Sequence, residues 1–185
     1  EPFRWASDDL YHPDMKDYVE GNYSADNQLG DEAEARKGES RLWKYYEGIR
    51  KASTFIVNVD RCPELTMDEI ADMKGQARFL RAYCYWALIR VYGPVPLIPL
   101  EGLDVNLSYE ELSLPREHFD NLVDFIDQEL AESARSLPTK RTVNNLGRPT
   151  RGAALGLRSR VLLYAASPLF NGNTDQASVK NKDGK

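Results

Sequence analysis

Few residues in this sequence stand at the spacings that catalysis or metal binding requires. The two histidines, His12 and His118, are far apart, and no nucleophile elbow, Walker loop, HExxH or CxxC pattern occurs. Asp8 and Asp9 beside His12 come nearest to a metal cluster, but no second histidine lies near them. The sequence therefore predicts no catalytic residue and no metal site.

Acidic residues between Glu117 and Glu132 recur three and four positions apart, which places them on the polar face of a helix. A pair of carboxylates can hydrolyse a glycosidic bond. A repeated acidic stripe on an amphipathic helix is more typical of a solvated face. We interpret these carboxylates as a solvated face.

Three arginines, Arg78, Arg81 and Arg90, fall within a long apolar run. Because that run is apolar over more than half of a helix circumference, the guanidinium groups must emerge at its edges or find carboxylates. We expect ion pairs between the helical hairpins, with partners such as Glu47 or Asp68. An anion-binding or sugar-binding role is the alternative.

Aromatic side chains also occur in the polar first forty residues, which hold four Lys/Arg against eleven Asp/Glu, a net charge of −7. Tyr23 is flanked by Asn22, Asp26 and Asn27 in a stretch rich in loop formers. A ring in a loop can stack on the C–H face of a sugar while Asp and Asn bind the hydroxyls. Alternatively, such a ring closes a hydrophobic core, which we expect for Trp43.

The element that must position these groups is a long amphipathic helix that begins after Thr66 and ends at Gly93. Thr66 and Glu69 have the spacing of a capping box, and Gly93 followed by Pro94 ends a helix. Two neighbouring apolar stripes predict that the helix is covered on more than one side. On that basis Leu80→Ala is expected to cost about 2–5 kcal/mol.

Three further helices are expected, giving an all-α fold of antiparallel helical hairpins with long irregular loops. We predict one partial domain: irregular residues 1–39, a hairpin at about 40–93, an extended loop at about 94–114, a helix pair at about 115–168 and a tail, 169–185. Pro115 is expected to open the third helix, and Thr150 to cap the fourth. The basic segment 138–160 is expected to pair with the acidic third helix. Close approach of another backbone is expected at four small residues, Gly152, Ala153, Ala154 and Gly156.

The bulk composition argues against nucleic-acid binding and against a membrane-spanning helix. The net charge of −5 gives no basic face for nucleic acid, and no apolar run approaches the roughly 20 residues that span a bilayer. Cys84 lies 18 residues past Thr66, about 27 Å along a helix, whereas Cys62 precedes that helix. We therefore expect no disulfide between the two cysteines.

Three stretches stand in this order along the chain: LWKYYEGIRKASTFIVNV (42–59), GQARFLRAYCYWALIRVYGPVPLI (75–98) and GRPTRGAALGLRSRVLLYAASPLFNG (147–172). Together with VDFIDQELAESARSLP (123–138), they resemble the SusD/RagB family of surface-exposed nutrient-binding lipoproteins of glycan-utilisation systems. The resemblance covers most of residues 40–172.

The resemblance implies an all-α fold with tetratricopeptide-like helix pairs, and glycan binding without catalysis or an organic cofactor. It also implies docking onto a TonB-dependent, SusC-like transporter that imports the oligosaccharide. The family's proteins lie at the outer-membrane surface on an N-terminal lipid anchor, which we expect to be absent from this chain because neither Cys62 nor Cys84 can serve as the anchor cysteine. Family chains are considerably longer, so we expect an N-terminal fragment.

The resemblance also implies that loops supply the ligand contacts. The predicted ligand-binding residues are Trp5, Asp9, Tyr23, Asp26 and Asn27, with stacking by Trp5 or Tyr23 and hydrogen bonds from the others. The alternative function is a helical-repeat scaffold that binds a protein and never binds sugar.

Overall fold

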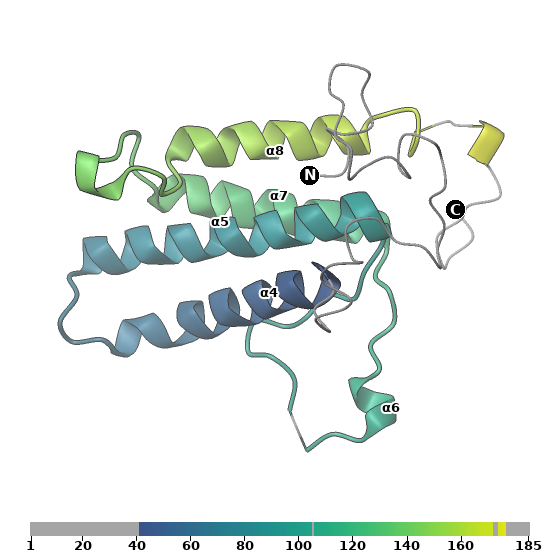
Figure 1. The fold of residues 1–185 in the computed structure, drawn as a ribbon, viewed down its shortest axis with the longest axis horizontal. Coiled ribbons are helices and arrows are strands. Elements are labelled where there is room, and N and C mark those ends of the chain that lie inside the picture. Colours follow the sequence, from purple (N-terminus) through teal and green to yellow (C-terminus); the bar gives the residue numbers. More distant parts are fainter. Residues whose placement is uncertain (1–40, 105, 172–173, 177–185) are drawn as a thin grey trace, which may run out of the picture. The chain divides into compact units, whose positions relative to one another are not determined.

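The computed structural model describes residues 41–104, 106–171 and 174–176 of the chain (Figure 1). The chain divides into two compact units, residues 1–44 and 45–185, and the second holds all the described helices except the first four residues of α4. The helices are α4 (Arg41–Asn58), α5 (Met67–Tyr92), α6 (Tyr109–Leu112), α7 (Phe119–Ser136) and α8 (Arg151–Ala165), with 3-10 turns η2 (Val59–Arg61), η3 (Val143–Asn145) and η4 (Thr174–Gln176).

The described residues contain no β-strand, and the predicted all-α fold is confirmed. None of their helices is both long enough and apolar enough to cross a membrane. The tetratricopeptide-like character of the helix pairs and the single partial domain stay predictions.

Helix α5 begins and ends where the sequence predicts. The hydroxyl of Thr66 accepts the N–H of Glu69 at 3.3 Å, and the Glu69 carboxylate accepts the N–H of Thr66 at 2.9 Å. Gly93 ends the helix with a φ of +64°, a conformation that residues with a Cβ rarely adopt. The capping box is therefore confirmed, and both ends of α5 are set by local sequence.

Helices α4 and α5 run antiparallel, joined by η2 and a short turn (Figure 1). Gly48 allows close contact, because a Cβ there would lie 3.0 Å from the sulfur of Cys84. Trp43 is 69% exposed, so its predicted place in a core is wrong. Its position on α4 lies off the stripe that is buried, which consists of Ile49, Ala52, Ser53 and Ile56.

Helix α5 packs mainly against α7, and its residues from Tyr85 to Ile89 are buried on every side, as the two apolar stripes predict. Its most deeply buried residues, each at most 2% exposed, are Ala82, Tyr85, Trp86, Ala87, Leu88 and Ile89. Gly75 touches the end of α7, where an added Cβ would lie 3.0 Å from the Cβ of Ser136. Leu80 and Val91 are 52% and 41% exposed, so the expected cover fails at these two positions. Periodicity alone does not tell which positions along an apolar stripe are covered.

Helix α7 begins at Phe119, four residues after the start predicted at Pro115. The N–H of Glu117 donates to the carbonyl of Val95 at 3.2 Å, which holds the chain beside an extended segment. His118 is the N-cap, with extended backbone angles. A contact with a distant segment therefore delays the helix that Pro115 permits.

Helix α8 packs mainly on α7. Thr150 caps it as predicted, since its hydroxyl accepts the N–H of Ala153 at 3.3 Å. Of the four small residues expected to admit another backbone, only Ala154 is buried. Gly152 and Gly156 are exposed, and a Cβ at Gly156 would meet nothing within 4 Å. The expectation of close approach is therefore wrong at the exposed positions, Ala153 included.

Residues 109–112 form a short helix, α6, where an extended connection was expected. The hydroxyl of Ser108 accepts the N–H of Glu111 at 3.3 Å, and the Glu111 carboxylate accepts the N–H of Ser108 at 2.9 Å. This second capping box closes one helical turn in a segment with no apolar stripe. In Figure 1, α6 stands apart from the long helices.

Candidate functional site

The five predicted ligand-binding residues, Trp5, Asp9, Tyr23, Asp26 and Asn27, lie outside the residues that the structure describes. Their roles stay predictions. The described part holds the scaffold that follows them along the chain: a buried charge network, a clamped extended segment and two grooves.

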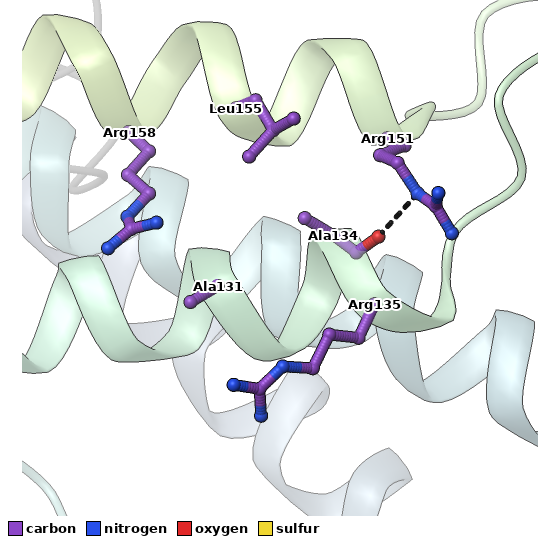
Figure 2. A pocket seen from close by; sticks show the side chains of 6 residues that line it. All are labelled: Ala131, Ala134, Arg135, Arg151, Leu155 and Arg158. Carbon is purple, nitrogen blue, oxygen red and sulfur yellow. Dashed lines mark hydrogen bonds between the residues drawn. The ribbon is translucent and has the colours of Figure 1, made fainter.

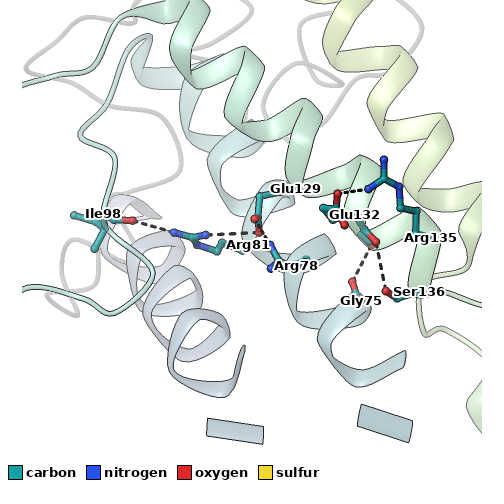
Figure 3. Close-up of polar contacts among 9 residues, drawn as sticks. Gly75, Arg78, Arg81, Ile98, Glu129, Glu132, Arg135 and Ser136 are labelled. Carbon is teal, nitrogen blue, oxygen red and sulfur yellow. Dashed lines mark hydrogen bonds and ion pairs between the residues drawn. The ribbon is translucent and has the colours of Figure 1, made fainter. Parts of the chain in front are cut away.

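A carboxylate of α7 holds two arginines of α5 (Figure 3). Glu129 is 7% exposed; its Oε1 accepts a hydrogen bond from Arg78 at 2.5 Å, and its Oε2 lies 3.6 Å from Arg81. Arg81 is 3% exposed, donates to the carbonyl of Ile98 at 3.0 Å and lies over the ring of Phe125, 4.8 Å from its centroid. The network therefore joins α5, α7 and the segment after α5.

The predicted ion pairing is confirmed for Arg78 and Arg81, but with Glu129 as the partner. Glu47, one of the carboxylates proposed, pairs with Lys51 on its own helix. Arg90 lies over the ring of Trp86, 5.1 Å from its centroid. Since Arg81 is enclosed and its charge faces Glu129, it is a structural residue and does not offer an anion site.

The buried network ends on residues 93–99, an extended segment that we call the strap. The hydroxyl of Tyr46 in α4 donates to the carbonyl of Pro96 at 2.9 Å. The hydroxyl of Tyr85 in α5 accepts the N–H of Ile98 at 2.9 Å. Burial raises the pKa of both tyrosines, so both hydroxyls stay protonated at physiological pH. Two helices therefore hold the strap from one side.

The residues just before α7 also hydrogen-bond to the strap and to the end of α5. Arg116 donates to the carbonyls of Tyr92 and Pro94, both at 2.8 Å. With the bond from Glu117 to Val95, these contacts bring the residues before α7 back to the end of α5. The loop from α5 to α7 therefore begins and ends at the same place, where these hydrogen bonds hold its two ends together; we call this place the clamped base.

The first groove lies between α7 and α8 and has a volume of about 440 Å³ (Figure 2). Arg158 forms a two-bond ion pair with Asp127, at 2.5 and 2.9 Å, which raises the pKa of the arginine. Arg151 donates from Nε to the carbonyl of Ala134 at 3.0 Å. The groove is lined by Ala131, Ala134, Arg135, Arg151, Leu155 and Arg158.

The ion pair of Arg158 confirms that the basic segment 138–160 pairs with the acidic helix, α7. Arg141 pairs instead with Asp72 of α5, at 2.6 and 2.8 Å. Arg135 pairs with Glu132 of its own helix. On the rim of the groove, the ion pair between Arg158 and Asp127 therefore joins α8 to α7, whereas the one between Arg135 and Glu132 lies within α7.

The second groove lies between α4 and α5, has a volume of about 530 Å³ and is mainly apolar. It includes Phe55, Leu80 and Cys84, which explains why Leu80 is exposed. Burial raises the pKa of the Cys84 thiol to about 11, so it is neutral at physiological pH. Cys62 and Cys84 are both free, as expected.

The described residues contain no group of three or more His, Cys, Asp or Glu side chains arranged to hold a metal ion. The side chains of Arg81, Glu129, Tyr46 and Tyr85 bond to other elements of the same fold. The described part thus forms a frame that fixes loops in place.

A family model described as starch-binding and associating with the outer membrane matches residues 10–163. This chain belongs to the SusD-like family. The match includes the predicted loop residues Tyr23, Asp26 and Asn27 and most of the helical frame. It confirms the resemblance found in the sequence.

The relatives of this SusD-like chain are much longer than it is. SusD-like protein P25 from Formosa agariphila is 24% identical over 166 residues, which make up 83% of this chain and 31% of that protein. A solved SusD-like protein from Bacteroides fragilis is 31% identical, with a TM-score of 0.60 over 66% of this chain and 23% of its own. Surface glycan-binding protein A from Bacteroides uniformis is 26% identical, with a TM-score of 0.60 over 75% of this chain and 28% of its own. The chain thus spans less than a third of each relative.

Sequence reasoning missed the structural carboxylate of the SusD-like frame. Glu129 was grouped with the solvated acidic stripe, yet it lies among Ile126, Leu130 and Ser133, all of which are buried. Its place in the apolar stripe of α7 was the available signal. The strap contacts of Tyr46 had no such signal, because they depend on how α4 meets a distant segment.

Proposed function

We propose that the full-length protein is a non-catalytic glycan-binding component of an outer-membrane uptake complex. The observation that carries this proposal is the family match over residues 10–163, with its description as starch-binding and outer-membrane-associated. The name of the relative from Bacteroides uniformis states glycan binding, which supports the same class of ligand.

Within this proposal, the loops before α4 bind the sugar. Trp5 or Tyr23 stacks on the C–H face of a sugar ring, while Asp9, Asp26 and Asn27 bond to its hydroxyls.

The uptake complex supplies the partner and the location in the same proposal. The protein lies at the cell surface on an N-terminal lipid anchor, and it passes bound oligosaccharide to a TonB-dependent, SusC-like transporter. Family membership supports the outer membrane as the site of action.

Native gel electrophoresis of the full-length protein tests sugar binding directly. Gels containing soluble starch, laminarin or xyloglucan should retard the protein, and Tyr23→Ala should relieve the retardation. Tyr11→Ala, a tyrosine of the same acidic segment that is not a predicted contact, is the matched control and should leave it unchanged. Release of sugar fragments by the pure protein would contradict a non-catalytic role.

A scaffold that binds only protein is the second candidate, favoured by the apolar groove between α4 and α5. Phe55 and Leu80 in this groove are 40% and 52% exposed. Retention of the protein on the transporter, with no retardation by any polysaccharide, would support this reading against the first. Leu80→Asp should then abolish co-purification with the transporter.

A further inference from the structure

The loop between the strap and α7 presents an aromatic ring to solvent. We call residues 100–104 and 106–114 the excursion; it contains α6, which stands apart from the long helices (Figure 1). Tyr109 is 86% exposed, the largest value among the exposed large apolar side chains of the described residues. Because its face is uncovered, the ring is available to a ligand.

The backbone that carries Tyr109 is fixed before any ligand arrives. The capping box of Ser108 and Glu111 closes the helical turn in which the tyrosine is the first residue. At the base, Arg116 and the bond from Glu117 to Val95 tie the excursion to the strap. A fixed platform loses little conformational entropy on binding, which favours its use as a contact surface.

The negative charge of the excursion favours uncharged sugars over anionic ones. Its residues include four carboxylates and no Lys or Arg; the carboxylates are Glu101, Asp104, Glu110 and Glu111. Carboxylates accept hydrogen bonds from sugar hydroxyls, whereas they repel sulfate esters and uronic acids over about 8 Å at physiological salt. Asp104 already accepts two hydrogen bonds from Asn106, at 2.9 and 2.8 Å, while Glu110 is exposed beside Tyr109 in the chain.

We propose that the excursion is a carbohydrate contact. Tyr109 stacks on the C–H face of an uncharged sugar ring, and the carboxylate of Glu110 accepts a hydrogen bond from a sugar hydroxyl. An aromatic face with an adjacent carboxylate matches the apolar ring face and polar edge of a pyranose. This inference rests on the proposed function and deepens it, because it assigns neutral glycans as the substrate class and adds a contact far in sequence from Tyr23.

The test uses the full-length protein with neutral and acidic probes. Dissociation constants are measured for soluble starch, laminarin and xyloglucan, and for polygalacturonate and dextran sulfate. At least one neutral glycan should bind, and Tyr109→Ala should weaken its binding about 2- to 10-fold. Tyr109→Phe, which keeps the ring, should bind like the wild type. Met67→Ala is the matched control, because Met67 is 80% exposed at the first residue of α5.

Several results would overturn this inference. Equal binding of a neutral glycan by Tyr109→Ala and the wild type would remove the contact, and if Tyr23→Ala weakens binding in the same assay the proposed function survives. Binding of the acidic probes alone would overturn the neutral class. A Tyr109→Ala protein that loses the transporter but keeps its glycan affinity would make the excursion a protein-docking element. Failure of the wild type to bind any probe would remove this inference together with the proposed function.

Discussion

Replacing Glu129 by alanine tests whether the buried network holds α7 against α5. The change leaves Arg81, which is 3% exposed, without its carboxylate and breaks the bond from Arg78. Removing one partner of a buried ion pair costs about 3–5 kcal/mol. Arg81 keeps the carbonyl of Ile98 and the face of Phe125, so we expect the lower end, about 3 kcal/mol of unfolding free energy.

Glu132→Ala is the matched control, three residues further along the same helix (Figure 3). The side chains of Glu132 and its partner Arg135 are 50% and 73% exposed. An exposed pair of this kind is worth about 0–1 kcal/mol. Because both variants replace Glu by Ala within α7, the difference between them isolates the effect of burial at Glu129.

Urea unfolding of the full-length protein, followed by circular dichroism, gives both free energies from the midpoint and slope. Raising the salt from about 0.1 M to about 1 M should remove the small cost of Glu132→Ala, because the Debye length falls from about 10 Å to about 3 Å. The cost of Glu129→Ala should persist, since solvent ions do not screen a buried pair well. A cost below about 1 kcal/mol for Glu129→Ala, or one equal to the control, would refute the reasoning.

Three further perturbations probe the packing, the groove thiol and the strap. Gly75→Ala should lower the free energy of unfolding by about 1–3 kcal/mol, because the new Cβ would lie 3.0 Å from a side chain of α7. Gly156→Ala, placed in open space, should raise it by about 0.5–1 kcal/mol; urea midpoints that shift in the same direction would contradict this. A Cys84 pKa of about 11 leaves little thiolate at pH 8, so iodoacetamide should alkylate Cys84 slowly at that pH. The reaction should become faster as the pH approaches 11, and it should be rapid in urea. Equal rates at pH 8 with and without urea would rule out the burial of the thiol. Tyr46→Phe removes the hydrogen bond to the carbonyl of Pro96 and should lower the free energy of unfolding by about 0.5–1.5 kcal/mol. It should also speed amide hydrogen exchange in the strap. Unchanged exchange would show that the strap is held without this hydrogen bond.

Local chemistry made several helix ends predictable. Thr66 with Glu69, Gly93, and Thr150 each act through bonds to residues within one helical turn, and the structure has all three ends in place. The predicted start of α7 at Pro115 is wrong because a distant residue decides it: Val95, 22 positions before Glu117, accepts a hydrogen bond from the N–H of Glu117. A proline permits a helix but does not require one.

Packing partners were less predictable than helix ends. Leu80, on an apolar stripe of α5, is 52% exposed, whereas Tyr85, which lies on neither stripe, is fully buried. Which positions are covered depends on where α7 docks, and close contacts such as the one at Gly75 determine that position. Tyr109 could not be singled out from the sequence, because its exposure follows from a short helical turn that no apolar stripe predicts.

The sequence of residues 100–114 can be replaced by a loop sequence from another protein, because hydrogen bonds at the clamped base hold the two ends of the excursion together. Bonds on both sides of the strap hold the ends of this loop together independently of what lies between them. Doubling the length of a flexible loop costs only about 0.6 kcal/mol in closure entropy. A grafted or randomised sequence can therefore replace the excursion while the helices keep their packing, and libraries built at this position would change what the surface recognises without redesign of the frame.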